Sequence, residues 1–420
     1  MFKQLYCSIG LFILLIFGGC GGGGGSGDVS PTASVTTPGT PQVKPPVTTS
    51  SCVVKPAIGS DKYRSAILDM RFEQPNDFTA DGKPVNSYEA VATVINKIDC
   101  VGFDTVVFQT NIPIDIATGK LALYDSRLGA FNPDKNIPKD FWRLVDYAKN
   151  KGLKVFIKAI PVNHTNDVVI CPGCTSTEFV LPPTFLTANF FNALFSYETT
   201  LAREAEKYKV DGFYVGVMNL GIDTAQYDAD WDRIIAQVKS VYKGKLIYEA
   251  CNQCSANVWS KVDIVAIHTS NVFEMAPSET VAGLLTDTSI LNLLGDVQRI
   301  ATLYQKPILF DTINIGATGK RTDLGAVISG AVPYTSLQPN YALQAIKIST
   351  VFELLGTKLS TRVVGLQWSE YMPWSQATWI QNPTNDTAWR WHQVQFYGFD
   401  LLNNESAQKK LSEYFSKPWT

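Results

Sequence analysis

Short apolar runs alternate with longer amphipathic stretches along most of the chain after residue 60. Eight runs have the length of buried strands: Ala66–Phe72, Thr105–Asn111, Lys154–Val162, Gly212–Met218, Lys245–Cys251, Ile264–Ser270, Pro307–Ile313 and Val363–Tyr371. The stretches with helical spacing are Ser87–Ile98, Pro138–Lys151, Ala188–Tyr208, Tyr227–Tyr242, Leu284–Tyr304, Tyr341–Leu355 and His392–Phe415. Only Ser255–Ser260, between the fifth and sixth strands, is too short for a full helix. This rhythm is typical of repeated βα units.

The apolar strands carry almost no polar residue before their ends, which is typical of parallel strands buried on both faces. Eight βα units in one domain predict a single (β/α)8 TIM barrel of the α/β class, with enlarged βα loops. An open, doubly wound sheet is the alternative. No G-x-G-x-x-G motif follows the first strand, so the dinucleotide site common in such sheets is not indicated, and no cofactor is predicted.

The N-terminus has the pattern of an export signal. A start containing Lys3 is followed by the apolar run Ile9–Phe17, which is too short to cross a bilayer, and then by Gly-Gly-Cys20. The end of this segment resembles a bacterial lipobox, which implies removal of residues 1–19 and acylation of Cys20, for example with palmitate. An ordinary secretory peptide is the alternative.

Residues 20–51 are rich in Gly, Ser, Pro and Thr and predict a flexible tether, so that residues 52–420 form the barrel domain. Because Gly21 replaces the aspartate of inner-membrane retention signals, we expect a lipid anchor in the outer membrane of the cell envelope. The barrel would be extracytoplasmic, and the lipid would be its contact with the membrane.

Composition narrows the possible functions. The chain has 36 basic and 38 acidic residues, a formal charge of −2 and 45% hydrophobic residues. This balance argues against nucleic acid binding through a basic surface and against a disordered chain. The sequence has three histidines and no H-E-x-x-H pattern, so it does not predict a histidine-rich catalytic metal site. It also has no G-x-S-x-G motif, so it does not predict a serine hydrolase with a nucleophile elbow.

Six cysteines remain after Cys7 and Cys20 are set aside. An even number outside the cytoplasm favours disulfides. Cys52 and Cys100 are predicted to form one bridge, which holds the start of the domain to the end of its first helix. The other four form two C-x-x-C units that favour disulfides, with a four-thiolate structural zinc site as the alternative: Cys171, Cys174, Cys251 and Cys254.

Polar side chains collect where the predicted strands end, and active sites of such barrels lie at the C-terminal ends of the strands. Carboxylates for acid/base chemistry, amides for hydroxyl groups and aromatic faces for sugar rings are what a carbohydrate cleft requires. The candidate catalytic acids are Glu370, Glu249, Asp311 and Asp69. The candidate substrate-binding residues are Arg71, Gln109, Lys158, Asn219, His268, Trp368 and Trp374.

Five short segments carry a resemblance to the clan A superfamily of barrel glycoside hydrolases, and more loosely to the family 113 β-mannanase group within it. They are Gly102–Phe108, Gly152–Val155, Val262–His268, Lys306–Phe310 and Gly365–Trp368. The resemblance implies a TIM barrel that acts on carbohydrate through two carboxylates, and it places His268 and Trp368 along the cleft.

The catalytic positions of that clan are not matched. Its acid/base glutamate ends the fourth strand, where Val217-Met218-Asn219 stands here, and its nucleophile ends the seventh, where Asp311-Thr312 stands. Strict alternation along the seventh strand predicts that Thr312, rather than Asp311, points inward.

Other carboxylates must therefore perform any catalysis. Glu249 and Glu370 are the preferred pair, with Asp69 and Asp311 in reserve. Each also has a structural interpretation: Glu249 as a partner of Lys158, Asp311 as a residue that bonds the loop backbone, and Asp69 as a partner of Arg71. The sequence thus predicts a glycoside hydrolase-like protein, with a non-catalytic glycan-binding barrel as the main alternative and a different hydrolase, lyase or structural envelope protein as the third possibility.

Overall fold

A computed structural model of the chain describes residues 52, 55–56, 61–69, 88–115, 118, 120–121, 124–125, 129–130, 140–163, 188–217, 224–251, 256–269, 272, 280–313, 315, 340–359, 362–371 and 405–419. The chain divides into two compact units, residues 1–50 and 51–420, and every described residue belongs to the second. The predicted signal peptide, Cys20 and most of the tether lie outside the described residues.

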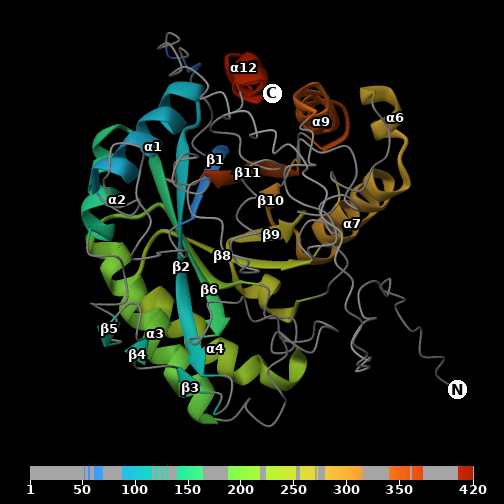
Figure 1. Ribbon diagram of the computed structural model, residues 1–420. Coiled ribbons are helices and arrows are strands. Elements are labelled where there is room, and N and C mark those ends of the chain that lie inside the picture. Colours follow the sequence, from blue (N-terminus) through green and yellow to red (C-terminus); the bar gives the residue numbers. More distant parts are fainter. Residues whose placement is uncertain are drawn as a thin grey trace, which may run out of the picture. The chain divides into compact units, whose positions relative to one another are not determined.

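Eight parallel strands close into a barrel, as the sequence predicts. In spatial order they are β1 (Tyr63–Asp69), β2 (Thr105–Asp115), β6 (Lys154–Asn163), β7 (Gly212–Val217), β8 (Lys245–Cys251), β9 (Ile264–His268), β10 (Ile308–Ile313) and β11 (Val363–Tyr371). The pairing of β1 with both β2 and β11 closes the ring, which occupies the centre of Figure 1. The predicted (β/α)8 architecture is confirmed, and the open sheet is excluded.

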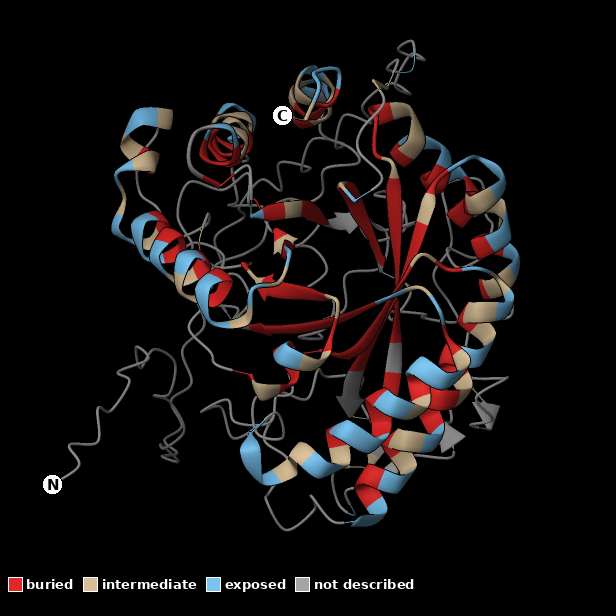
Figure 2. Ribbon diagram, turned by 180° about the vertical axis from the view of Figure 1, so that it is seen from behind, coloured by how far each residue is buried: buried red, intermediate tan, exposed pale blue. Residues whose placement is uncertain are grey.

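Helices follow the strands and surround the ring. They are α1 (Tyr88–Val101), α2 (Phe141–Asn150), α3 (Ala188–Lys207), α4 (Asp228–Val241), α6 (Val281–Leu285), α7 (Thr288–Tyr304), α9 (Tyr341–Leu354) and α12 (Glu405–Phe415). Short turns of helix complete the set at η2 (Ala225–Tyr227), η3 (Asn257–Lys261) and η5 (Leu355–Leu359). Figure 2 shows buried strands at the centre and helices that bury one side and expose the other.

Two local features differ from the predicted elements. The predicted helix Leu284–Tyr304 is split into α6 and α7, because the Asp287 side chain accepts a hydrogen bond from Ser289 N and caps a new helix start. Beyond the barrel wall, β2 pairs with the antiparallel strand β3 (Lys120–Leu121), and β4 (Tyr124–Asp125) pairs with β5 (Gly129–Ala130).

Two apolar clusters fill the domain, one inside the barrel and one between the strands and helices. The inner cluster includes Ile67, Phe156 and Leu309, while Phe310 on the neighbouring position belongs to the outer cluster. A Cβ atom on Gly365 would lie 2.1 Å from a methyl carbon of Leu309, so only glycine fits this point of the wall. Three of the strands also carry charged side chains inside the barrel: Lys158, Glu249 and Asp311.

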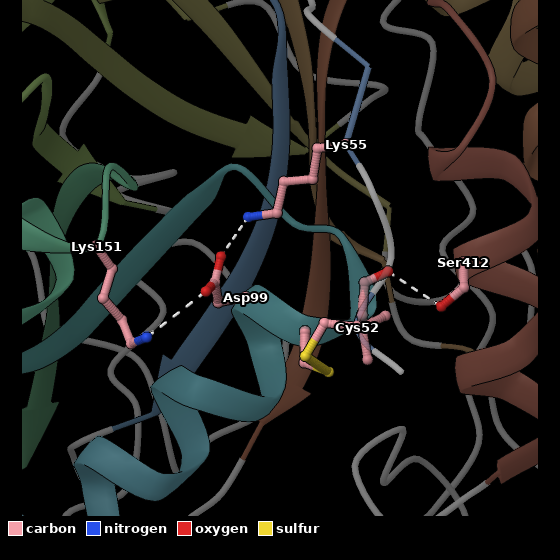
Figure 3. The surroundings of a disulfide bond; sticks show 7 residues. Cys52, Lys55, Asp99, Lys151 and Ser412 are labelled. Carbon is pink, nitrogen blue, oxygen red and sulfur yellow. Dashed lines mark hydrogen bonds and ion pairs between the residues drawn. A yellow bond between two sulfur atoms is a disulfide. The ribbon is translucent and has the colours of Figure 1, made fainter. Parts of the chain in front are cut away.

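A disulfide joins Cys52 to Cys100 and fixes the start of the domain at the end of α1, which confirms the predicted bridge (Figure 3). Beside it, Asp99 forms ion pairs with Lys55 and Lys151. Ser412 of α12 donates to Val101 O, which ties the last helix to the same corner. Of the other predicted cysteines, Cys171, Cys174 and Cys254 lie outside the described residues, and only the backbone of Cys251 is described. Among the described helices, none has the length and hydropathy of a membrane span.

Candidate active site

Three charged side chains meet inside the barrel. Lys158 of β6, Glu249 of β8 and Asp311 of β10 come from alternate strands, whose inward side chains share a layer in such barrels. Lys158 Nζ lies 2.8 Å from Glu249 Oε2 and 2.7 Å from Asp311 Oδ1, and all three side chains are at most 1% exposed. One ammonium group therefore bridges two carboxylates. The pairing of Glu249 with Lys158, foreseen as the structural interpretation of Glu249, is present.

Neutral donors surround Asp311. The Tyr214 hydroxyl donates to Asp311 Oδ2, and Thr312 Oγ1 donates to Asp311 Oδ1 at 2.8 Å. With its amide turned so that its nitrogen faces these acceptors, Gln367 Nε2 donates to Asp311 Oδ2 at 2.9 Å and to the Tyr214 hydroxyl oxygen at 2.8 Å. Among the described residues, the Asp311 carboxylate thus bonds other side chains.

His268 connects the buried charges to the surface. Its Nδ1 lies 2.6 Å from Glu249 Oε1, and its side chain is 20% exposed whereas Glu249 is fully buried. Thr312 is also half-buried and lies next to both acids. These two side chains mark where the cluster, which we call the Lys158 cluster (Lys158, Tyr214, Glu249, His268, Asp311, Thr312 and Gln367), approaches the mouth of the barrel at the C-terminal ends of the strands.

The two carboxyl groups differ in proton affinity. Burial alone would raise the pKa of Glu249, but Lys158 and His268 outweigh it and lower the pKa to about 2. Burial, followed by the charge on Glu249, raises the pKa of Asp311. Burial would lower the pKa of Lys158, yet the two acids raise it. The buried cluster therefore balances one cation against one anion and pushes its second carboxyl toward the neutral form.

The predicted inward position of Thr312 instead of Asp311 is wrong. Leu309 belongs to the inner cluster, and Asp311 has the same parity and also points inward. Thr312 follows with φ 52°, and the pairing of β10 with β11 shifts between Phe310 and Ile313. A positive φ is strained for a β-branched residue. The irregularity brings both Asp311 and Thr312 to the Lys158 cluster.

Trp368 does not line the cleft, so its predicted contact with substrate is wrong. It is fully buried in the outer cluster, where its ring stacks on Phe352 of α9 with 5.7 Å between centroids. The inward residue of this part of β11 is Gln367, which contacts Tyr214. The position that the family resemblance assigned to Trp368 is therefore not the one it has in this barrel, where the pairing of β11 with β10 shifts register between Ile308 and Leu309.

The remaining predicted residues fall into three groups. Gln109 is buried on β2 and its Cα pairs with that of Asp69 at the end of β1. Asp69 and Glu370 lie in described strands, but their side chains are outside the description. Arg71, Asn219 and Trp374 lie outside the described residues altogether.

Sequence reasoning missed Tyr214 and Gln367. Both are polar-tipped residues with inward parity in otherwise apolar strands, and this parity is the signal that could have identified them. Within the described part of the chain, no group of three or more His, Cys, Asp or Glu side chains is placed to hold a metal ion.

Comparisons with known proteins agree with this geometry. A family model described as Glycoside Hydrolase Family 113 matches residues 127–323, a range that contains every member of the Lys158 cluster except Gln367. No curated protein is significantly similar to the chain in sequence.

Solved structures resemble the barrel at low sequence identity. A GH113 β-mannanase from Alicyclobacillus acidocaldarius, in complex with ManMIm, is 14% identical with a TM-score of 0.56 over 84% of this chain and 97% of that one. A GH113 β-1,4-mannanase in a complex structure is 16% identical with a TM-score of 0.54, over 84% and 98% of the two chains. An exo-β-1,4-mannosidase from Opitutaceae bacterium strain TAV5 is 13% identical with a TM-score of 0.51, over 86% and 62%. Residues 51–420 therefore form a (β/α)8 barrel similar in fold to these mannanases, and residues 127–323 of it match a glycoside hydrolase family model.

Proposed function

We propose that the protein is an envelope-anchored glycosidase that hydrolyses a poly- or oligosaccharide at the mouth of its barrel. The family match and the mannanase neighbours make β-1,4-mannan and its oligosaccharides the first substrates to test.

The two carboxyl groups that meet at Lys158 support this proposal most directly. Glycoside hydrolysis requires one carboxyl group that holds a proton for the leaving oxygen and one ionised carboxylate. Glu249, whose pKa is lowered, is the candidate ionised carboxylate, and Asp311 is the candidate for the second carboxyl group. Asp311 also ends the seventh barrel strand, where the clan has its nucleophile.

Access distinguishes this proposal from a second candidate function. Both acids are fully buried, and the partly exposed His268 and Thr312 separate them from the mouth. Hydrolysis through this pair therefore requires the glycan to open that entrance. Because Lys158 already neutralises the acids, the arrangement also favours a non-catalytic barrel that only binds glycan.

A hydrolysis and binding screen separates the two functions. The full-length protein is incubated with mannan, glucan and xylan oligosaccharides, alongside Glu249→Gln, Asp311→Asn and Glu370→Gln. Asp230→Asn, at a half-buried position on α4 outside the Lys158 cluster, is the matched control. We expect reducing sugar from the parent and from Asp230→Asn, and a loss of at least about 100-fold in kcat for Glu249→Gln and Asp311→Asn. Unfolding curves verify that each variant is folded.

Two other results would redirect the assignment. Glycan binding by the parent without product from any substrate would favour the non-catalytic barrel. Loss of activity in Glu370→Gln, with full activity in the Glu249 and Asp311 variants, would move catalysis away from the Lys158 cluster.

The envelope anchor is tested separately. We expect the mature N-terminal peptide to begin at Cys20 with the mass of an acylated cysteine, and we expect the protein to fractionate with the outer membrane. Cys20→Ser should release it. An unmodified N-terminal peptide from a soluble protein would refute the anchor without bearing on hydrolysis.

A further inference from the structure

At the end of the barrel opposite the candidate site, most of the exposed charged side chains are positive. We call it the base face, and it consists of described residues only: those that enter the strands from the preceding helices, the first residues of those strands, and 52, 55–56, 61–62 and 416–419 at the chain ends. Its exposed cations are Lys151, Lys209, Lys243, Lys245, Arg362 and Lys417, and its one exposed acid among these described residues is Asp61.

Three other acids of the base face are occupied inside the fold. Each of them directly precedes a strand and accepts a hydrogen bond from a backbone N–H at the start of a neighbouring strand. They are Asp104, Asp211 and Asp263. The donors are Arg64 N at 3.0 Å, Val155 N at 2.8 Å and Leu246 N at 2.8 Å. The negative charges of this end thus tie strands together, while the positive charges face outward. The formal charge of −2 for the whole chain conceals this asymmetry.

The chain also enters the domain at the base face. Cys52 is bonded to Cys100 at the end of α1, and Lys55 pairs with Asp99 at the same corner (Figure 3). The segment before residue 52 must therefore leave the domain from this end, whatever path it takes. The composition of residues 20–51 predicts a tether with a root-mean-square span of roughly 30 Å, and a tether of that span would keep this end near an acylated Cys20.

From these observations we infer that the base face docks on anionic phospholipid headgroups of the membrane that holds the anchor, so that the mouth of the barrel faces away from the bilayer. This inference rests on the proposed lipid anchor, though not on hydrolysis. Several Lys and Arg side chains near an anionic surface add attraction that fades within roughly 8 Å at physiological salt. Contact therefore requires the close approach that the entry point of the chain provides.

Vesicle binding of the full mature chain carrying Cys20→Ser tests the face without the lipid. We expect binding to phosphatidylcholine vesicles in which about 30% of the lipid is anionic phosphatidylglycerol. Binding to vesicles of phosphatidylcholine alone should be much weaker. The triple variant Lys209→Glu/Lys243→Glu/Arg362→Glu should lower the partition coefficient on the order of 100-fold. The matched variant Lys120→Glu/Arg143→Glu/Arg233→Glu changes the net charge equally at exposed positions away from the base face, and should bind within about threefold of the parent.

Orientation is measured on the acylated protein in the same vesicles by hydrogen–deuterium exchange. We expect slower exchange in the base loops 208–211 and 242–244 on anionic vesicles, and unchanged exchange at 266–269 near the mouth. Equal losses in the two triple variants, equal binding to both vesicle types, or protection of 266–269 would overturn the inference. The inference would also be overturned if the base-face triple variant lost its binding to a soluble anionic polysaccharide but kept its binding to vesicles. If the mass of the N-terminal peptide shows no acyl group on Cys20, the anchor is refuted. The vesicle experiment with Cys20→Ser does not depend on that result.

Discussion

Two buried acidic regions of the barrel show opposite behaviour at the same degree of burial. In the Lys158 cluster, Glu249 is fully buried beside a lysine and a histidine, and its pKa falls to about 2. On α3, Glu198 is also fully buried, but no described residue offers a hydrogen bond to either carboxyl oxygen, and burial raises its pKa to about 8. Burial alone favours the neutral acid. At Glu249 the charge of Lys158 and the contact with His268 outweigh burial, whereas at Asp311, which contacts the same lysine, burial and the charge on Glu249 keep the pKa raised.

The difference gives the two glutamates opposite effects on stability. A lowered pKa stabilises the fold above the unfolded value of 4.5, and this stabilisation is lost as pH falls toward 2. A raised pKa means that the fold is relatively most stable below 4.5, and the advantage is lost as pH rises toward 8. These two groups together therefore predict greatest stability in weakly acidic solution.

Removal of the cation should have the largest effect. Lys158→Met leaves Glu249 and Asp311 buried without their shared partner, and we expect a loss of about 3–5 kcal/mol in the free energy of unfolding at pH 7, measured with urea. The matched variant Lys158→Met/Glu249→Gln/Asp311→Asn removes all three charges and should recover most of the loss. If the triple variant is as unstable as the single one, packing rather than charge is responsible.

Glu198→Gln should have the next largest effect, in the opposite direction. The charge that Glu198 would carry at pH 7 is disfavoured, so its removal should stabilise the fold by on the order of 3 kcal/mol at pH 7. The gain should vanish near pH 4, where the carboxyl is neutral in both states. Glu204→Gln on the same helix, at a half-buried position, is the control and should leave the pH profile unchanged. A gain that is independent of pH would contradict the raised pKa.

Glu249→Gln should produce a smaller change because Asp311 remains to pair with Lys158. We expect a loss of about 2 kcal/mol at pH 7 and a flatter decline of stability between pH 4.5 and 2 than in the parent. Unfolding curves across that range make the measurement. An unchanged acid limb would show that other groups dominate acid unfolding.

The strands and helices of the barrel could be predicted from the sequence, whereas the contacts among the polar residues inside it could be predicted only in part. The predicted strands Lys245–Cys251 and Val363–Tyr371 have the bounds of β8 and β11, because runs buried on both faces leave little ambiguity. Glu249, Asp311, Lys158 and His268 were also candidates, since each ends or interrupts such a run. That Lys158 bridges the two acids is a long-range contact that periodicity does not specify.

The two errors have different causes. For β10 the sequence assigned the wrong parity, since Leu309 and Asp311 both point inward, and the positive φ of Thr312 then brings that residue to the same cluster. For Trp368 the family resemblance did not carry over, because this side chain packs on Phe352 in the outer cluster. Composition likewise averages charge over the chain. The cations of the base face became visible only once the topology had gathered the loops of that end.

The smallest predicted effect concerns the hydroxyl that joins the two halves of the Lys158 cluster. Tyr214 donates to Asp311 and contacts Gln367, so Tyr214→Phe removes one donor to a buried carboxyl while Lys158, Thr312 and Gln367 still serve it. We expect a loss of about 1–2 kcal/mol, measured by urea unfolding at pH 7. Tyr242→Phe is the control: it removes a buried hydroxyl that donates to Val210 O, a neutral acceptor, and should cost about 1 kcal/mol or less. If the two variants lose equal stability, the charge on Asp311 adds nothing to its bond with Tyr214, and the contrast between partnered and unpartnered buried acids rests on Lys158 alone.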